Sequence, residues 1–251
     1  MSCARPGSIS GESLLGGRVR HTQAPGGFRS GIEPVLLAAS VPARPGDRVI
    51  EAGCGAGAGL LCLTARVGRI QGLGIERDAA EAARARANAA ANGMDGLTFV
   101  IADIARAPIA AGVAHHVFAN PPYHRLTAAP PSADNRRRAA KSATEETLAV
   151  WVGSMARVTR SGGTVTLALP AASTPDAIDA FRAAGIGSAI LWPLWPRADR
   201  PAKLMLLQGR VGGRGPFRIG PGLMLHRAGQ SYTDAAEAIL RHGAALTLCA
   251  S

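Results

Sequence analysis

The alternation of strand-like and helix-like segments along this chain is the feature that most restricts its possible folds. Short apolar runs at residues 48–52, 70–75 and 97–101 predict strands, and the intervening segments 58–67 and 78–92 predict helices. Neighbouring parallel strands need a long crossover connection, for which a helix is the usual solution. The pattern therefore predicts βαβ units and an α/β fold with a mostly parallel sheet.

The second half of the chain continues this alternation with longer interruptions between the elements. We find no internal repeat, and we expect one domain over residues 46–251 that follows an N-terminal extension over residues 1–45. The further elements that we expect are strands at 115–119, 164–169, 189–191 and 203–207, helices at 142–158 and 174–184, a proline-rich loop at 192–201, and an exposed turn or hairpin at 209–222.

The composition is that of a globular protein, because hydrophobic residues make up 47% of the 251 residues. No segment approaches the roughly 18 consecutive apolar residues that a membrane span requires. The first residues, Met1–Gly7, lack the apolar core of a secretion signal. We therefore predict a cytoplasmic protein without a membrane partner.

The cysteines and histidines give no indication of a metal site. No two cysteines form a C-x-x-C pair, so neither a zinc site nor a disulfide framework is indicated, and we expect no metal. We interpret His115 and His116 as structural because no acidic or cysteine residue is near them in the sequence. The four cysteines are Cys3, Cys54, Cys62 and Cys249, of which the middle two are expected near the core.

The charge is strongly basic, with a formal net charge of +11. Such a surface attracts polyanions and favours RNA as a partner, although arginine also serves as a general solubilising residue in chains with a GC-rich coding bias. Arg136–Arg138 and Lys141 form a compact cluster in a polar segment. A second and looser cluster comprises Arg197, Arg200, Lys203, Arg210, Arg214 and Arg218.

The tetrapeptide Asn120–Tyr123 (Asn-Pro-Pro-Tyr) follows a predicted buried strand. Its two prolines cannot donate to a strand ladder, so they end the strand and stiffen the turn. The Asn120 side-chain oxygen and the Pro121 carbonyl can accept two hydrogen bonds from one planar –NH2 group, and Tyr123 offers a ring for stacking. An ordinary turn at a strand end is the alternative interpretation.

The segment Glu51–Gly57 is a glycine-rich loop between the first predicted strand and helix. Glycines allow a tight turn and a close approach of the backbone to a ligand. Glu76, at the end of the second strand, can accept both ribose hydroxyl hydrogens of a nucleoside, and Asp103 ends the third strand. A dehydrogenase would need a similar loop. The acid at Glu51 and the Asn-Pro-Pro-Tyr turn favour S-adenosylmethionine over a dinucleotide.

These motifs together resemble the Rossmann-like class I methyltransferases that act on amino nitrogens. Across roughly residues 16–240, the chain is most similar to the bacterial tRNA1(Val) (adenine-37-N6)-methyltransferase family. The resemblance implies a mostly parallel seven-stranded sheet flanked by helices, with the N-terminal extension packed near the cofactor site. The flanking segments that carry the resemblance are 27–39, 203–209, 223–226 and 232–237.

The resemblance also implies a reaction, a cofactor and a set of site residues. A methyl group would pass from S-adenosylmethionine to an exocyclic amino nitrogen, with adenine N6 of tRNA as the first choice. The implied catalytic residues are Asn120, Pro121, Pro122 and Tyr123. The implied cofactor contacts are Glu51, Gly53, Cys54, Gly55, Gly57, Glu76, Arg77, Asp103, Ile104 and Asn120, and the implied substrate contacts are Tyr123, His124, Arg136, Arg137, Arg138 and Lys141.

Two acids depart from the family pattern, and several other functions share parts of it. Glu51 and Glu33 stand where the family commonly has Asp, so the amino-acid end of the cofactor is expected to be held differently.

A protein glutamine N5-methyltransferase acting on release factors is the second enzyme hypothesis, because an amide –NH2 presents the same chemical problem. DNA adenine methylation comes third, and a non-catalytic RNA-binding module is the alternative from another class.

Overall fold

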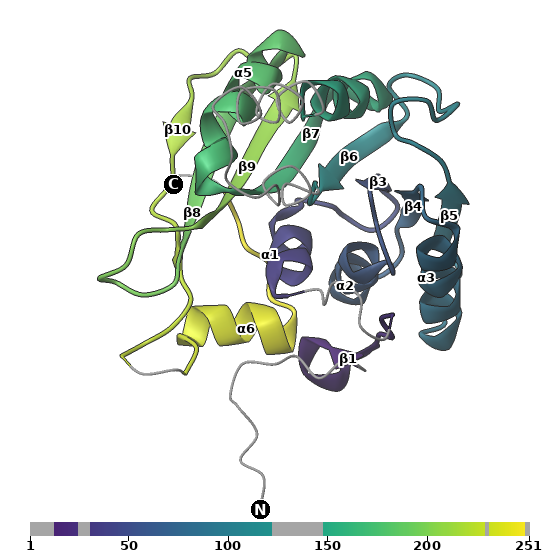
Figure 1. Ribbon diagram of the computed structural model, residues 1–251, viewed down its shortest axis with the longest axis horizontal. Coiled ribbons are helices and arrows are strands. Elements are labelled where there is room, and N and C mark those ends of the chain that lie inside the picture. The colour runs from purple at the N-terminus through teal and green to yellow at the C-terminus, as the bar shows by residue number, and fades with distance from the viewer. Residues whose placement is uncertain (1–12, 25–30, 122–147, 229–230, 249–251) are drawn as a thin grey trace, which may run out of the picture.

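The computed structural model describes residues 13–24, 31–121, 148–228 and 231–248 (Figure 1). Seven strands form the central sheet: β3 (Arg48–Ala52), β4 (Gln71–Glu76), β5 (Leu97–Ile101), β6 (Ala114–Ala119), β7 (Thr159–Pro170), β8 (Ile186–Trp195) and β9 (Leu204–Val211). Their order across the sheet is β8-β9-β7-β6-β3-β4-β5. Neighbours are parallel from β7 to β5, whereas β9 is antiparallel to both β7 and β8. The prediction of a mostly parallel sheet is therefore confirmed.

Two further strands of two residues each bring the sheet to nine strands, rather than the seven that we expected. They are β10 (Arg218–Ile219) and β11 (Leu223–Met224), and both pair parallel with β8. Gly209–Gly222 is accordingly no hairpin, because β9 continues to Val211 and the chain then returns to the outer side of β8. Strands this short carry too little pattern to be read from the sequence.

The expected loop at 192–201 is also wrong in its first half, since β8 runs on to Trp195. Trp192 and Leu194 are buried, and this burial compensates for the proline between them. Pro193 lies at the break between β10, which pairs up to Leu191, and β11, which pairs from Leu194. A sheet tolerates a residue without an N–H at such an interruption.

Helices cover both faces of the sheet (Figure 1). One face packs against α1 (Glu33–Ser40), α2 (Ala58–Val67), α3 (Ala79–Ala91) and α6 (Asp234–His242), and the other packs against α5 (Thr174–Ala183) and a helix over residues 148–158. Side chains alternate between the two faces of the sheet along β6. Phe118 therefore packs in the core under α1, α2, α3 and α6, and Val117 packs in the core on the opposite face. Within the described residues, no helix is long and apolar enough to cross a membrane.

The ends of α3 follow from local signals in the sequence. Asp78 caps the helix, since its Oδ1 accepts hydrogen bonds from the amides of Ala80 and Glu81 at 2.8 and 3.2 Å. At the other end, Asn92 is followed by Gly93, whose φ of 63° is in the left-handed region that favours glycine. This helix supplies the side chains that hold the N-terminal segment.

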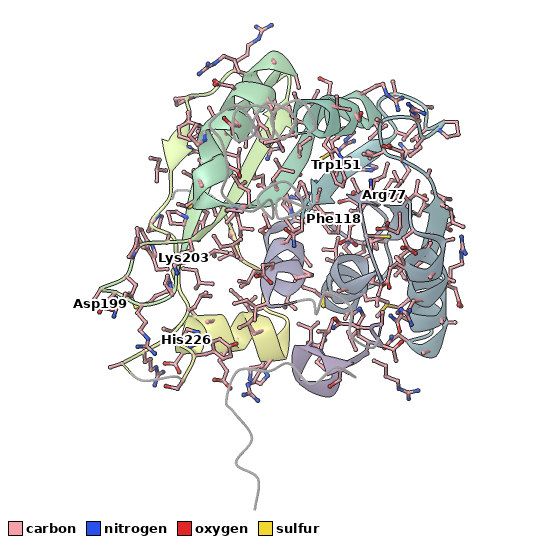
Figure 2. The ribbon with its side chains drawn as sticks, in the orientation of Figure 1. Arg77, Phe118, Trp151, Asp199, Lys203 and His226 are labelled. Carbon is pink, nitrogen blue, oxygen red and sulfur yellow. The ribbon has the colours of Figure 1, made fainter. Side chains whose placement is uncertain are left out.

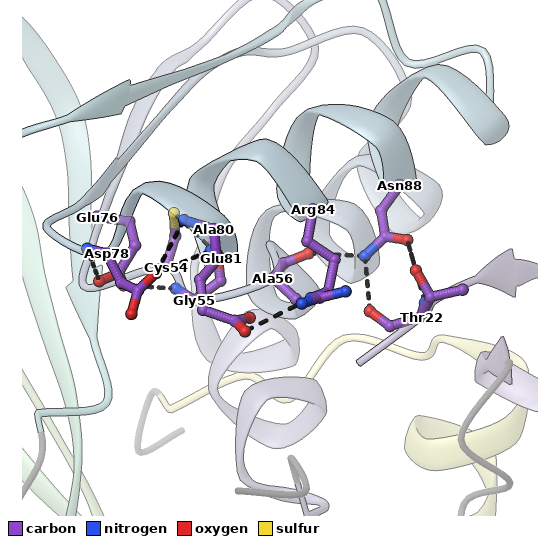
Figure 3. Close-up of polar contacts among 10 residues, drawn as sticks. All are labelled: Thr22, Cys54, Gly55, Ala56, Glu76, Asp78, Ala80, Glu81, Arg84 and Asn88. Carbon is purple, nitrogen blue, oxygen red and sulfur yellow. Dashed lines mark hydrogen bonds and ion pairs between the residues drawn. The ribbon is translucent and has the colours of Figure 1, made fainter. Parts of the chain in front are cut away.

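The N-terminal segment consists of β1 (Ser13–Leu14), the 3-10 turn η1 (Leu15–Gly17) and β2 (Val19–Arg20), followed by an extended stretch. Its contact with α3 depends on the buried Asn88 (Figure 3). The Asn88 side chain accepts from the amide and hydroxyl of Thr22, and donates to the carbonyls of Thr22 and Ala56 at 3.1 and 3.0 Å. Asn88 thus links the N-terminal segment, α3 and the glycine-rich loop.

His21 lies beside this link and is fully buried. Burial lowers the pKa of His21 to about 4, with a smaller opposing effect from the backbone of Ala56. The imidazole is therefore neutral near pH 7, and its protonation opposes folding as the pH falls from 6.5 towards 4.

Replacing Asn88 by Ala is expected to lower the free energy of unfolding by about 2–3 kcal/mol, because the backbone of Thr22 and the buried carbonyl of Ala56 lose their partners. Asn92→Ala is the matched control, since Asn92 binds the backbone of the exposed Arg20 from a half-buried position one turn later. Its expected cost is about 1 kcal/mol. Urea denaturation of both variants provides the measurement, and equal losses would contradict the special role of Asn88.

Candidate functional site

The carboxyl ends of four neighbouring strands meet at one edge of the sheet and carry most of the predicted site residues. The register of β3 with β6 pairs their last residues, so Gly53 and Asn120 leave the sheet side by side. The register of β3 with β4 places Glu76 next to Gly53. Asp103 follows two residues after the end of β5, the next strand. Open α/β sheets bind their ligands at this edge.

The glycine-rich loop has a backbone that requires glycine at three positions. Gly53, Gly55 and Gly57 have φ values of 66°, 51° and 87°, which lie in the left-handed region. The loop is fixed to β4 because the amides of Gly53 and Cys54 both donate to the Ile75 carbonyl, at 2.8 and 3.1 Å. The loop geometry is thus set by the fold itself.

Trp151, which is labelled in Figure 2, contacts this loop from the helix over residues 148–158. A Cβ added to Gly53 would lie 2.6 Å from the Cη2 atom of the indole, which is closer than real Cβ contacts allow. A larger residue at position 53 is therefore disfavoured twice, by the positive φ of the backbone and by the contact with the indole. No local signal in the sequence indicates the contact, since the two residues are distant along the chain.

Glu76 holds the loop from the neighbouring strand (Figure 3). Its Oε2 accepts from the Gly55 amide and its Oε1 from the Asp78 amide, both at 2.9 Å. A carboxylate oxygen has two lone-pair directions, so each oxygen keeps one for a further donor. The arrangement can therefore hold a diol, such as the two ribose hydroxyls of a nucleoside, without breaking the loop.

The residues at the ends of β4 and β5 differ in exposure. The carboxylate of Asp103 is exposed and is oriented by the Ala105 amide, which donates to its Oδ1 at 2.9 Å. Arg77 is exposed as well, whereas Ile104 is buried in the core. The charged groups of Asp103 and Arg77 can contact a ligand directly, whereas the Ile104 side chain packs in the core next to the site.

Glu51 is buried beneath the first turn of α2 rather than at the open edge. Its Oε2 accepts from the Leu60 amide at 2.9 Å, and its carboxyl lies so close to Gly59 that a Cβ there would collide with it. Burial raises the pKa of Glu51 to about 8, the Leu60 hydrogen bond opposes this, and the charge of Glu76 adds to it. Glu51 is therefore largely protonated near pH 7.

The two described cysteines, Cys54 and Cys62, are free and buried. Burial is the main reason that the pKa of each thiol is raised, and the charge of Glu51 adds to it. A protonated, buried thiol is a poor nucleophile. Cys54 therefore shapes the loop: its Sγ faces Gly74, where an added Cβ would lie 2.7 Å away.

Two residues of the predicted turn Asn120–Tyr123, which we call the acceptor turn, are described: Asn120 is half-buried and Pro121 is buried. Within the described part of the chain, no hydrogen bond engages the Asn120 side chain, so no described residue competes for its amide oxygen. The remaining predicted catalytic and substrate contacts lie outside the described residues: Pro122, Tyr123, His124, Arg136, Arg137, Arg138 and Lys141.

His115 and His116 do have an acidic partner, which the sequence did not reveal. Asp47 lies 3.2 Å from Nε2 of His116 and 3.8 Å from Nε2 of His115, at the amino edge of the sheet opposite to the site. The other ring nitrogen of His116 is 2.8 Å from the buried Thr164 hydroxyl. Among the described residues, no group of three potential ligands could hold a metal ion.

Comparison with known proteins identifies a matching domain family and a similar curated protein. Residues 49–143 match a methyltransferase domain. Over 189 residues, the chain is 31% identical to the tRNA1(Val) (adenine(37)-N6)-methyltransferase of Dickeya chrysanthemi, and the alignment covers 74% of each protein.

Solved structures share the fold. A protein from Agrobacterium tumefaciens described as a predicted O-methyltransferase superposes with a TM-score of 0.72, at 22% identity over 86% of this chain and 98% of that one. Geranyl diphosphate methyltransferase in complex with SAM gives a TM-score of 0.53, at 16% identity over 70% and 82% of the two chains. The prediction of a Rossmann-like class I methyltransferase fold is thereby confirmed.

Gly53→Ala is expected to weaken binding of the predicted cofactor at least tenfold, because the new methyl group must displace Trp151 or the loop. Gly93→Ala is the matched control, since its φ is also positive but nothing lies within 4 Å of the added Cβ. The control should lose only about 1–2 kcal/mol of stability from backbone strain and keep its affinity. Isothermal titration calorimetry with S-adenosylmethionine compares the two, and equal affinities would refute the steric argument.

Glu51→Gln is expected to become more stable relative to the wild type as the pH rises from 4.5 to 8. The folded wild type keeps Glu51 protonated up to pH about 8, whereas the unfolded chain ionises it near 4.5, so wild-type stability is lost across this window. The loss is at most about 1.4 kcal/mol per pH unit. Glutamine retains an oxygen for the Leu60 amide and carries no charge.

Urea denaturation at pH 5, 6, 7 and 8 measures this stability difference. His21 titrates with the opposite sign in an overlapping range, but it is present in both proteins and cancels in the difference. A difference that does not change with pH would show that Glu51 ionises normally in the folded protein.

Proposed function

Because this chain belongs to the S-adenosylmethionine-dependent class I methyltransferases, in the family of the tRNA1(Val) (adenine(37)-N6)-methyltransferases, we propose that it methylates the N6 amino group of an adenine in tRNA. The observation that carries this proposal is the pairing of the last residues of β3 and β6, which brings the acceptor turn at Asn120 beside the first glycine of the cofactor loop. The donor and the acceptor of a methyl group must be held next to each other for the transfer to occur.

The described residues fit the cofactor. In our proposal the Glu76 carboxylate accepts the two ribose hydroxyls, Asp103 faces the adenine amino group, and the loop at Gly53 lies against the methionine end. Glu51 lies beneath α2 rather than at this edge, and the cationic amino group of the methionine end would favour its ionised form if it bound nearby, because burial has raised the pKa of this carboxyl. Bound S-adenosylmethionine supplies an electrophilic methyl group on a sulfonium.

The acceptor turn would prepare the nitrogen for attack. An adenine amino group is a weak nucleophile because its lone pair is delocalised into the ring. Asn120 and the Pro121 carbonyl would accept its two hydrogens and favour a pyramidal nitrogen whose lone pair points at the methyl carbon. Asn120 and the Pro121 carbonyl would thus orient the nitrogen towards the methyl group that S-adenosylmethionine would supply; methyl transfer would leave S-adenosylhomocysteine, and the proton lost from the amino group would pass to solvent.

Binding of the RNA is supported by the charge of the chain, +11. We propose that Tyr123 stacks on the extruded base, a contact worth roughly 1–3 kcal/mol, and that His124, Arg136–Arg138 and Lys141 contact the RNA around it. We place the reaction in the cytoplasm.

We further propose that residues 1–45 act as an extension that braces the cofactor loop. The hydrogen bonds of Asn88 support this role, because they connect Thr22 of the extension to the Ala56 carbonyl of the loop. Residues 46–251 then form the catalytic domain.

The test is transfer of labelled methyl groups to total tRNA from a strain that lacks this enzyme. We expect the label as N6-methyladenosine, and we expect Asn120→Ala to lower kcat by 100-fold or more, with an S-adenosylmethionine affinity within threefold of the wild type. Asn92→Ala serves as a control for an asparagine lost outside the site.

Label in release factors and none in RNA would replace the proposal with glutamine N5 methylation. Cofactor binding without transfer to either acceptor would leave the RNA enzyme unsupported. Full activity of Asn120→Ala on tRNA would remove the role assigned to that side chain.

A further inference from the structure

Positive charge is concentrated in the stretch 196–227, which holds seven of the arginines and lysines and a single acid, Asp199. The sequence predicts one loose cluster of six of these cations, without Arg227, but the structure separates them. Arg210 and Arg214 lie towards the amino edge of the sheet, since Arg210 is opposite Thr164 of β7 and Arg214 adjoins the start of β8. Only part of the cluster is thus on the side of the functional site.

Arg197, Arg200 and Lys203 form what we call the basic corner, in the loop between β8 and β9. All three residues are exposed. β8 and β7 are each antiparallel to β9, and β7 is parallel to β6, so the loop leaves the same edge of the sheet as Asn120. The basic corner therefore lies at the edge that carries the acceptor turn.

The charge of the basic corner is hardly neutralised within the described part of the chain. Arg200 approaches Asp199 at 3.7 Å, and both side chains are about 70% exposed (68% and 74%), so this pair is worth little. No described acid pairs with Arg197 or Lys203. A polyanion can therefore bind here without first breaking a strong ion pair.

An aromatic pair adjoins the basic corner. The rings of His226 and Tyr232 stack with centroids 4.7 Å apart, and the His226 amide donates to the Pro196 carbonyl at 3.1 Å. Figure 2 shows Asp199, Lys203 and His226 on the same side of the molecule. Cations beside half-buried rings are typical of surfaces that bind nucleic acid.

The distance to the site suits a nucleic acid. Three interstrand spacings separate β8 from β6 in the order β8-β9-β7-β6, which amounts to about 14 Å. About four nucleotides cover this distance at 3.4 Å per nucleotide. A base held at Asn120 would leave the flanking backbone within reach of the basic corner.

We propose that the basic corner binds backbone phosphates of the RNA substrate a few nucleotides from the methylated adenine. This inference rests on the proposed function, because the partner is the RNA on which that reaction acts. Its contacts are to phosphate, so they set affinity and register and do not read the sequence.

The experiment compares two triple variants that lose the same net charge. The first is Arg197→Gln, Arg200→Gln, Lys203→Gln, and the control is Arg69→Gln, Arg160→Gln, Arg214→Gln, whose three arginines are exposed at the amino edge of the sheet. Filter binding of unmethylated tRNA at a series of salt concentrations gives the Kd and its salt dependence. Calorimetry with S-adenosylmethionine verifies folding.

We expect the first triple variant to bind tRNA at least tenfold more weakly than the wild type, with a slope of log K against log salt reduced by about 2–3. The control should stay within threefold, and both variants should retain wild-type affinity for S-adenosylmethionine. Equal weakening of the two variants would overturn the proposal, because it would show an effect of net charge alone.

Unchanged binding by the first triple variant would also overturn the proposal. If the wild type neither binds nor methylates tRNA, the proposed function fails and this inference fails with it. That outcome is distinct from the others, because it appears before any variant is made.

Discussion

The parallel register of β3 with its two neighbours is the constraint on which the site depends. It aligns the ends of β4, β3 and β6, so that Glu76, Gly53 and Asn120 leave the sheet together. Side chains alternate between faces with a period of two, so a slip of one residue would exchange Val117 and Phe118 between the two cores. The hydrophobic pattern of β6 therefore also fixes the position of the acceptor turn. Core packing and site geometry are in this sense one property of the strand.

The glycine-rich loop is held rigidly, and the buried carboxyl of Glu51 next to it costs free energy when it ionises. Hydrogen bonds from Gly53 and Cys54 to β4, and from Gly55 to Glu76, fix its backbone before any ligand arrives. Glu51 then places a carboxyl under α2, where burial raises its pKa to about 8. An apolar side chain would fit such a position at lower cost near neutral pH. A positively charged ligand would favour the ionised form of this carboxyl, to which the described residues supply a hydrogen bond from Leu60 but no cation.

The sequence predicted the parts of the structure that depend on local signals. The alternation of strands and helices and the glycine-rich loop at 51–57 follow from consecutive residues, and the structure confirms them. Contacts between distant residues were not predictable, such as Trp151 with Gly53 or Asp47 with His116. The loop expected at 192–201 was wrong because buried tryptophan outweighs proline when the neighbouring strand is interrupted. The predicted loose basic cluster is likewise split in the structure, because the directions of β8 and β9 place its members at opposite edges of the sheet. Strand pairing of this kind is a long-range property that neighbouring residues do not encode.

The two halves of the sheet have separate tasks that meet at the point where the strand order reverses. From β3 the chain proceeds to β4 and β5 on one side and returns to β6 and β7 on the other. Ligands of open α/β sheets bind at this switch point. The groups that suit a nucleoside, Glu76 and Asp103, lie on the first side. Asn120 lies on the second side, and the basic corner follows it at the same edge. The topology therefore sets the predicted cofactor contacts and the predicted substrate contacts on opposite sides of β3, and among the described residues it brings them together at Gly53 and Asn120.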